Sequence, residues 1–405
     1  MTAGEGREGR GGPPDEEGVA RRAARGFETR AIHAGQDPDP VTGAVVPPIS
    51  LATTFAQRAV GRHGGWEYSR SGNPNRASLE MCLASLEGAR HGLAFASGLA
   101  AEDAVLRLQR RGAGIVLGGD AYGGTFRLID KVYGASGHPW TAVDLTDPAR
   151  LDRDWPEGTA MVWAETPTNP AMDVVDIAAI AEVAHAHGAR LVVDNTFATP
   201  YLQQPLALGA DVVVHSSTKY LGGHSDVVGG FVATDDIELA MDLGFVQNAV
   251  GAVPSPIDCY LVQRGLKTLA LRMERHCDNA RAVVEVLTDH PAVERVLWPG
   301  LPGHPGHDVA KRQMRDFGGM VSCVMRGGEP AALALAERTE VFTLAESLGA
   351  VESLIEHPAR MTHASAAGSP LAVDPGLVRL SVGIETADDL VADLRQALDS
   401  VDASG

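Results

Sequence analysis

Several kinds of residue and segment are scarce in this chain of 405 residues, and each scarcity excludes a class of protein. The four cysteines are widely separated and form no C-x-x-C pair, so neither a disulfide framework nor a cysteine zinc site is expected. No apolar run approaches the ~18 residues that cross a bilayer, and the first residues lack the apolar core of a secretory signal. We therefore expect a cytoplasmic protein without a membrane partner.

Positive charge is also in short supply. The formal net charge is −18, which repels nucleic acid and removes it from the expected partners. Two pairs of histidines could suggest a metal, but His185 and His187 lie two apart on a predicted helix and face different sides. The other pair, His304 and His307, lies in a Gly-Pro loop. No metal site is predicted.

Lysine is the scarcest charged residue. Only four lysines occur beside thirty arginines: Lys131, Lys219, Lys267 and Lys311. Lys219 follows a buried-looking strand, 211–214, within the segment 215–224. Only an amine can lose its proton and form an imine with an aldehyde, because a guanidinium stays charged. Lys219 is therefore the candidate for covalent chemistry, although a lysine at a strand-to-loop junction can also serve no such purpose.

Composition divides the chain into four segments. Residues 1–26 are mostly Gly, Arg and Glu, and so little apolar surface cannot offset the entropy lost on ordering, which predicts a disordered tail. Residues 27–75 start with a Pro-rich, irregular stretch that is typical of an arm lying over a neighbouring subunit. The whole length exceeds the ~250–300 residues at which one core stops growing, so we expect two domains, 76–265 and 266–405.

The larger predicted domain alternates short apolar runs with helical periods, which indicates βα units around a mostly parallel sheet. The apolar runs lie at 92–96, 114–117, 161–164, 191–193, 211–214 and 229–233, with helices predicted at 98–110 and 176–187. The second domain is predicted to contain a helix at 266–287, strands at 293–297, 319–325 and 377–382, and a closing helix from 387. Ligands bind beyond the carboxyl ends of such strands, where we expect Ser97, Asp120, Glu165, Asp194 and Lys219 to gather.

Four loops or strand ends contain candidate binding groups. The Ser97-Gly98 junction suits a phosphate at a helix N-terminus, although small residues are common there and the G-x-G-x-x-G spacing is missing. Asp194 could pair with a protonated cofactor ring nitrogen or merely cap the next helix. Tyr68 and Arg70 suit a phosphate, and Tyr122 before two glycines could approach a flat ring. Without context, a solvated loop and a plain turn explain these last two segments equally well.

Together these motifs resemble the Cys/Met-metabolism family of pyridoxal-phosphate enzymes. The segments that carry the resemblance are 68–74, 97–101, 165–170, 194–197 and 216–220, and the likeness runs from about residue 29 to 396. It implies pyridoxal 5'-phosphate as cofactor and the type I, aspartate aminotransferase-like fold. That fold has a large cofactor-binding α/β domain with a mostly parallel seven-stranded sheet, and a smaller C-terminal α/β domain.

The resemblance also implies a role for each candidate. Lys219 would bind the cofactor covalently and move protons, Asp194 would hold the ring nitrogen, and Tyr122 would stack on the ring and protonate the departing sulfur. The further cofactor-binding residues would be Ser97, Gly98, Leu99, Ser216 and Thr218, with Tyr68 and Arg70 reaching in from a neighbouring subunit. The family's usual assembly is a homotetramer, a dimer of dimers.

On the substrate side, the resemblance assigns Arg379 to the α-carboxylate, with help from Asn169 and Ser347. Glu67, Arg127 and Glu346 would suit the zwitterionic far end of cystathionine. Within the family the chain is most similar to cystathionine gamma-lyases, which implies γ-elimination on L-cystathionine to L-cysteine, 2-oxobutanoate and ammonia.

Two other activities of the family remain open. One is γ-replacement of O-succinyl- or O-acetylhomoserine with cysteine, as in the gamma-synthases, which share most of these features. The other is methionine gamma-lyase activity, which is less favoured because those enzymes carry a cysteine in the loop that here reads Tyr122-Gly-Gly-Thr125. Methionine also lacks a charged far end, so three desolvated charges would count against it.

Overall fold

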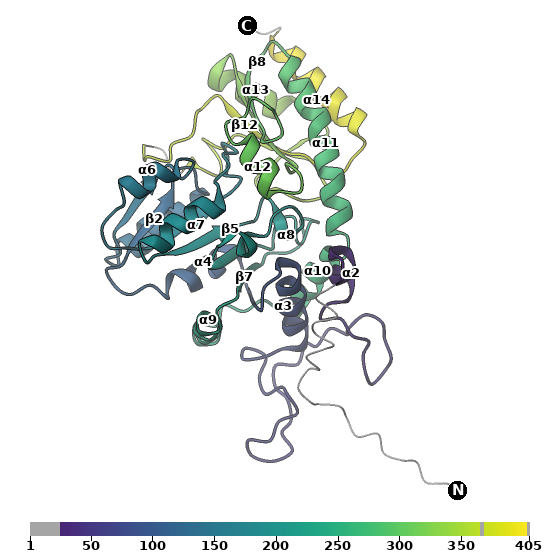
Figure 1. The fold of residues 1–405 in the computed structure, drawn as a ribbon. Helices are drawn as coiled ribbons and strands as arrows, with labels where there is room; N and C mark the ends of the chain where they lie inside the picture. Colours follow the sequence, from purple (N-terminus) through teal and green to yellow (C-terminus); the bar gives the residue numbers. More distant parts are fainter. Residues whose placement is uncertain (1–24, 365–367, 403–405) are drawn as a thin grey trace.

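Two β-sheets form the framework of the protein. The computed structural model describes residues 25–364 and 368–402, so the predicted tail, 1–26, lies outside the described residues except for its last two. In Figure 1 the larger sheet and its helices form one body, and the smaller sheet lies beside it with two long helices. The predicted α/β fold class, a mostly parallel sheet of seven strands beside a smaller one, is confirmed. The exact domain boundaries stay a prediction.

The seven-stranded sheet follows the predicted apolar runs. Its strands are β1 (His91–Phe95), β2 (Gly114–Gly118), β3 (Trp140–Val143), β4 (Thr159–Glu165), β5 (Arg190–Asp194), β6 (Val212–Ser216) and β7 (Gly230–Thr234), in the order β1-β7-β6-β5-β4-β2-β3. Only β7 runs antiparallel to its neighbours. The prediction missed β3, because this edge strand is only partly buried and lacks a continuous apolar run.

Helices cover this sheet, and the amino ends of several lie at the carboxyl edge of the strands. Ser97 caps α4 (Gly98–Leu106) by accepting the Ala100 N–H at 3.1 Å, and α4 ends before the predicted residue 110 because the chain turns towards Gly112 at φ 82°. Asp176 caps α7 (Ile177–Ala186) in the same way. The other helices of this part are α3 (Pro74–Glu87), α5 (Gly123–Arg127), η1 (Leu128–Gly134), α6 (Pro148–Arg153), α8 (Thr199–Leu202), η2 (Pro205–Leu208) and α9 (Ile237–Val250).

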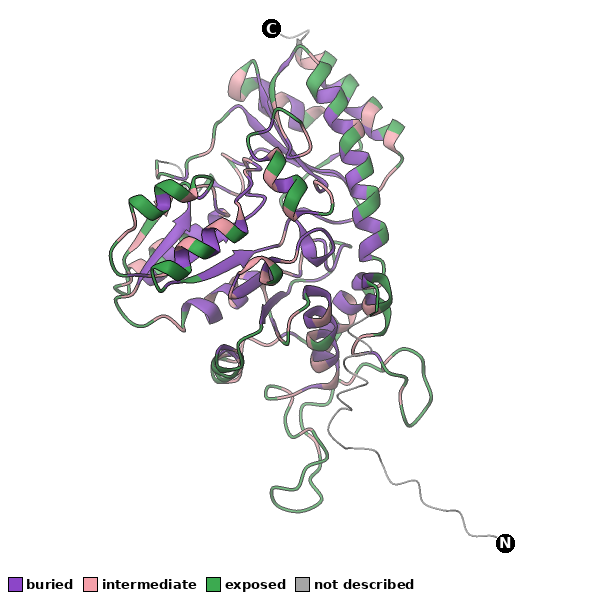
Figure 2. Ribbon diagram, viewed as in Figure 1, coloured by how far each residue is buried: buried purple, intermediate pink, exposed green. Residues whose placement is uncertain are grey.

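The smaller sheet has five strands, of which the central strands β11, β12 and β9 are buried (Figure 2). In the order β10-β11-β12-β9-β8 they are β10 (Thr343–Leu344), β11 (Leu354–Glu356), β12 (Leu377–Ser381), β9 (Met320–Met325) and β8 (Val293–Leu297). The prediction missed β10 and β11, which are too short to show a period. The helices are α10 (Pro256–Leu266), α11 (Leu269–Asp289), α12 (His307–Gln313), α13 (Gly328–Arg338) and α14 (Ala387–Asp402). The predicted helix at 266–287 is thus wrong at its start, because α10 ends where α11 is about to begin.

An irregular arm leaves the body between α2 (Phe27–His33) and α3. Figures 1 and 2 show it as exposed loops that project away from both sheets. Its apolar side chains are unusually open, with Val41 90% and Val45 80% exposed. Among residues 25–364 and 368–402, no helix is both long and apolar enough to cross a membrane.

Candidate active site

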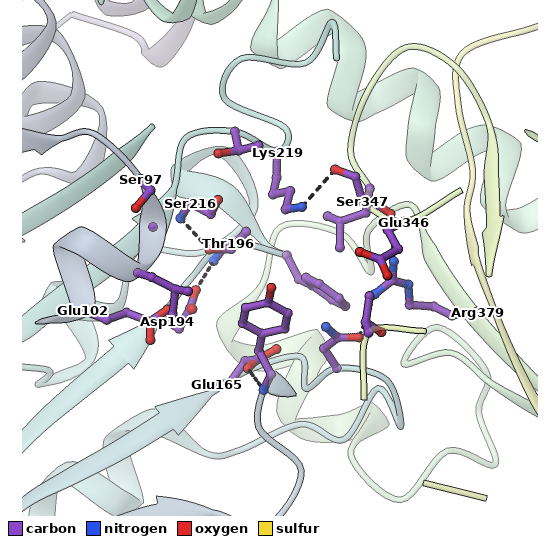
Figure 3. A pocket seen from close by; sticks show the side chains of 18 residues that line it. Ser97, Glu102, Glu165, Asp194, Thr196, Ser216, Lys219, Glu346, Ser347 and Arg379 are labelled. Carbon is purple, nitrogen blue, oxygen red and sulfur yellow. Dashed lines mark hydrogen bonds between the residues drawn. The ribbon is translucent and has the colours of Figure 1, made fainter. Parts of the chain in front are cut away.

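A cavity of about 280 Å³ lies where the carboxyl edge of the large sheet meets residues of the smaller sheet (Figure 3). Many of the predicted site residues line it: Ser97, Gly98, Leu99, Tyr122, Asn169, Asp194, Ser216, Thr218, Lys219, Glu346, Ser347 and Arg379. These residues are distant in sequence, and they meet because parallel strands place their carboxyl ends on one edge. The cavity therefore brings the predicted lysine, carboxylate and phosphate-binding groups together.

Lys219 supplies an amine inside this cavity. It lies three residues beyond the end of β6, and its Nζ donates a hydrogen bond to Ser347 Oγ at 2.9 Å. Burial, with the positive charge of Arg379 as the second cause, lowers the pKa of Lys219 from 10.5 to about 8. A sizeable fraction of the amine is therefore neutral near physiological pH, as attack on an aldehyde requires.

Asp194 places a carboxylate at the opposite end of the cavity. It is the last residue of β5 and accepts the Thr196 N–H on Oδ1 at 2.9 Å. Burial raises the pKa of Asp194, while the hydrogen bonds from Thr196 lower it. Within the described part of the chain, no lysine or arginine lies within ion-pair distance of this carboxylate. A cationic ligand atom would supply the missing charge.

The amino end of α4 forms a third wall suited to an anion. Free backbone N–H groups at Gly98 and Leu99 and the helix dipole favour a phosphate there. Gly98 also has to be small, because a Cβ at this position would lie 3.0 Å from the Cβ of Ser216. Thr218 stands on the same side of the cavity, held by the Gly229 N–H that its Oγ1 accepts at 3.0 Å.

Tyr122 contributes an aromatic side chain between these groups. Its backbone N–H donates to Glu165 Oε2 at 2.8 Å, and its ring meets that of His363 edge to face at 6.4 Å. Gly124 must be glycine, because an added Cβ would overlap the Tyr122 ring. Burial raises the pKa of the Tyr122 phenol, so the group stays protonated at neutral pH and can act as an acid.

Arg379 forms the buried cationic wall of the cavity. Its Nη1 donates to Asn169 Oδ1 at 2.9 Å and pairs with Glu356 at 3.0 Å, and its Nη2 donates to the Ser347 carbonyl at 2.8 Å. The arginine is 2% exposed, and its Nε has no hydrogen-bond partner among the described residues. Ser347 adopts φ 95°, which aims its carbonyl and hydroxyl at Arg379 and Lys219. A free, buried guanidinium donor of this kind suits a carboxylate.

Four predicted residues do not reach the cavity in a single chain. Tyr68 and Arg70 lie on the arm, where Tyr68 is 48% exposed and Arg70 Nη1 donates to the Asn248 carbonyl at 2.7 Å. Glu67 is exposed on the same arm and accepts from Gln57 at 3.1 Å. Arg127 is exposed at the end of α5. Their predicted roles stay predictions.

Sequence reasoning missed several groups that lie in or next to the cavity. These are Glu102, Thr196, Phe197, Leu348, Glu356, Thr362 and His363, and Glu165 had been placed at the edge without a role. Glu102 was detectable, since it follows Gly98 by four residues and so shares its helix face. Glu356 was not, because its pairing with Arg379 depends on the register of β11 against β12.

The donor set fits one cofactor chemistry. A neutral lysine suits an aldehyde, the α4 terminus with its hydroxyl neighbours suits a phosphate, and the uncompensated Asp194 suits a protonated ring nitrogen. Together with the fold, these groups define a pyridoxal-phosphate enzyme of the type I fold.

Comparison with known proteins gives the family. The model of the Cys/Met metabolism PLP-dependent enzyme family matches residues 28–399. A cystathionine gamma-synthase of Mycobacterium tuberculosis is 57% identical over 95% of this chain and 99% of that protein. A cystathionine beta-lyase of Coxiella burnetii is 52% identical over 92% and 97%. The crystal structure of a cystathionine gamma-lyase from Lactobacillus plantarum, complexed with L-serine, covers 93% of this chain and 100% of its own at 47% identity and a TM-score of 0.90.

The chain therefore belongs to the Cys/Met metabolism family of pyridoxal-phosphate-dependent enzymes. Pyridoxal 5'-phosphate is its cofactor, as the predicted resemblance implied.

Proposed function

We propose that this enzyme acts at the γ-carbon of an amino-acid substrate, with L-cystathionine as product or substrate. The observation that carries the proposal is that Arg379 and Lys219 line the same small cavity, where both side chains contact Ser347. A substrate whose α-carboxylate binds Arg379 would place its amino group and Cα beside the lysine. The relatives' names support the same substrate, because all three contain cystathionine.

The first reaction we propose is γ-replacement, in which O-succinyl- or O-acetylhomoserine and L-cysteine give L-cystathionine and the free acid. Its support is the 57% identity to a gamma-synthase of Mycobacterium tuberculosis, against 50% to a gamma-lyase of Dictyostelium discoideum. The γ-elimination expected from the sequence rested in part on three charged residues, and of these Glu346 alone lines the cavity. The single chain therefore gives the lyase no advantage over the synthase.

Each step assigns a task to a residue of this chain. Arg379 and Asn169 would orient the α-carboxylate, which fixes the Cα–H bond relative to Lys219. The bound cofactor supplies an electron sink that acidifies the protons at Cα and Cβ. Lys219 Nζ would accept and return those protons, and its lowered pKa suits both directions near neutral pH. Asp194 would keep the ring nitrogen protonated and the sink effective.

The second candidate is γ-elimination, in which cystathionine and water give L-cysteine, 2-oxobutanoate and ammonia. Its support is the Tyr122 phenol, which remains protonated at neutral pH and would donate its proton to the departing sulfur. Glu346 at the cavity would attract the ammonium group at the far end of cystathionine. Both reactions use the same Arg379 and Lys219 arrangement.

Parallel rate measurements on purified holoenzyme test the proposal. Cystathionine formation would be followed with each homoserine ester plus cysteine, and 2-oxobutanoate formation with cystathionine alone, using Lys219→Ala as the inactive control. We expect replacement to be the faster reaction. A faster cleavage of cystathionine would reverse the order of the candidates, and inactivity towards both substrates would overturn the assignment to the γ-carbon.

A further inference from the structure

The cavity contains a carboxyl group that the proposed mechanism does not use. Glu102 lies on α4, one helical turn beyond Gly98, and Figure 3 shows its carboxyl group beside that of Asp194. The residue is 3% exposed, and its Oε2 has no hydrogen-bond partner among the described residues. A buried carboxyl oxygen without a partner costs free energy, so its place in a ligand cavity points to a function.

Among the described residues, the titratable groups that act on Glu102 are acids, while the histidine His215 acts on its neighbour Asp194. Asp194 faces it from β5, Glu165 from β4 and Tyr122 from the start of α5. The cations of the same cavity lie elsewhere, since Lys219 binds Ser347 and Arg379 pairs with Glu356.

The position of Glu102 among these groups determines its charge. Burial, and then the negative charge of Asp194, raise the pKa of Glu102 well above its usual range. Both effects favour the protonated, neutral form of Glu102.

We propose that Glu102 and Asp194 form a carboxyl pair that shares one proton and together recognises the protonated ring nitrogen of pyridoxal phosphate. Two adjacent buried carboxyl groups do not both ionise, because each negative charge opposes the other. The pair then carries one negative charge, which matches the single positive charge of the ring nitrogen.

The shared proton has a consequence at alkaline pH. As pH rises, free cofactor loses its ring proton and binds an ordinary aspartate less well. Glu102 loses its own proton in the same direction, so the pair becomes doubly negative and holds the ring proton more strongly. The pair thus extends cofactor binding to higher pH than Asp194 alone could.

Cofactor titration of apoenzyme between pH 6.5 and 9.5 tests the pair, with calorimetry and cofactor absorbance as readouts. We expect Glu102→Gln, a neutral group of the same shape, to bind within about threefold of wild type at pH 7. At pH 9.5 it should bind at least about tenfold more weakly, which corresponds to one pKa unit at the ring nitrogen. Glu102→Asp, which keeps the carboxyl group, should restore part of the alkaline affinity and controls for folding.

Parallel pH curves for wild type and Glu102→Gln would overturn the proposal, as would an equal loss at both pH values. A second comparison uses the partner residue. Asp194→Asn should keep measurable cofactor affinity, because the Glu102 carboxyl group of the pair remains, whereas Asp194→Asn with Glu102→Gln should lose it. Equal affinity in these two variants would also contradict the pair. Cofactor binding is measured throughout, so the outcome is independent of which reaction occurs at the γ-carbon.

Discussion

At the scale of single residues, burial determines the chemistry of the site. Lys219, Glu102 and Arg379 are ordinary ionisable side chains, and each is moved from its usual pKa mainly by removal from water. The direction differs with the sign of the charge: burial raises the pKa of the acid and lowers the pKa values of the two bases. The cavity therefore favours a neutral amine at Lys219 and a protonated carboxyl group at Glu102.

The pH dependence of cofactor attachment tests the lysine. Because the pKa of Lys219 is lowered to about 8, its amine is neutral above that pH and protonated below it. We expect the rate at which apoenzyme takes up pyridoxal phosphate covalently to rise with pH and to level off above about pH 8. Stopped-flow absorbance would measure this rate, with Lys219→Ala as a blank. A rate that still rises steeply up to pH 10 would show that the pKa of Lys219 is not lowered.

At the scale of elements, neighbouring strands and helix ends place the site residues opposite one another. The register of β11 against β12 sets Glu356 directly across from Arg379, and the two side chains form a buried ion pair at 3.0 Å. The amino end of α4 lies so close to β6 that a side chain at position 98 would press on Ser216. These contacts depend on strand pairing and helix packing, so each predicts the effect of one substitution.

Glu356→Ala should be strongly destabilising, because it leaves the Arg379 charge buried and unpaired. Loss of one partner of a buried pair costs about 3–5 kcal/mol of the free energy of unfolding. The matched control is Glu329→Ala, which removes an exposed pair with Arg360 at 2.7 Å and should cost at most about 1 kcal/mol. Urea unfolding of both variants measures the difference. A similar loss of unfolding free energy in both variants would mean that the buried pair stabilises the protein no more than the exposed pair does.

Gly98→Ala should weaken cofactor binding without unfolding the protein. The added Cβ would lie 3.0 Å from the Cβ of Ser216, so the helix end or β6 must shift by a few tenths of an ångström. Such a shift misplaces the N–H groups that would hold the phosphate, while alanine itself favours a helix. Cofactor affinity and thermal unfolding would be measured together. Unchanged affinity would place the phosphate elsewhere.

At the scale of the whole molecule, the cavity of one chain contains only part of the predicted set of cofactor-binding residues. Tyr68 and Arg70 lie on the exposed arm and do not line the cavity, and apolar side chains such as Val41 and Val45 are open on the same arm. Both facts support the prediction that the arm completes the site of a neighbouring subunit. The predicted homotetramer is the assembly in which this exchange would occur.

Mixed oligomers test this exchange. Arg70→Ala and Lys219→Ala should each be inactive alone, but subunits mixed after mild dissociation should regain activity. When subunits of a two-fold dimer pair at random, about half of the dimers are mixed, and each mixed dimer has one site with both native residues. About a quarter of all sites are then native. Specific activity of the mixture is the readout, with each variant mixed with itself as the control. Absence of recovery, with mixing confirmed by mass spectrometry, would contradict an arm shared between subunits.

The sequence by itself determined most strands of the large sheet and the identity of the cofactor, because both depend on residue types within short segments. Apolar runs predicted all of the large sheet except its edge strand, β3. The rare Lys219, Asp194 at a strand end and the Ser97-Gly98 junction indicated the cofactor, because each role needs one residue type at one kind of strand end.

Only the tertiary structure decided the partners of these groups. The Glu356–Arg379 pair, the raised pKa of Glu102 beside Asp194 and the distance of Tyr68 and Arg70 from the cavity depend on strand register, burial and the path of the arm. Contacts between segments far apart in the chain determine these properties, and no local pattern of residues records them.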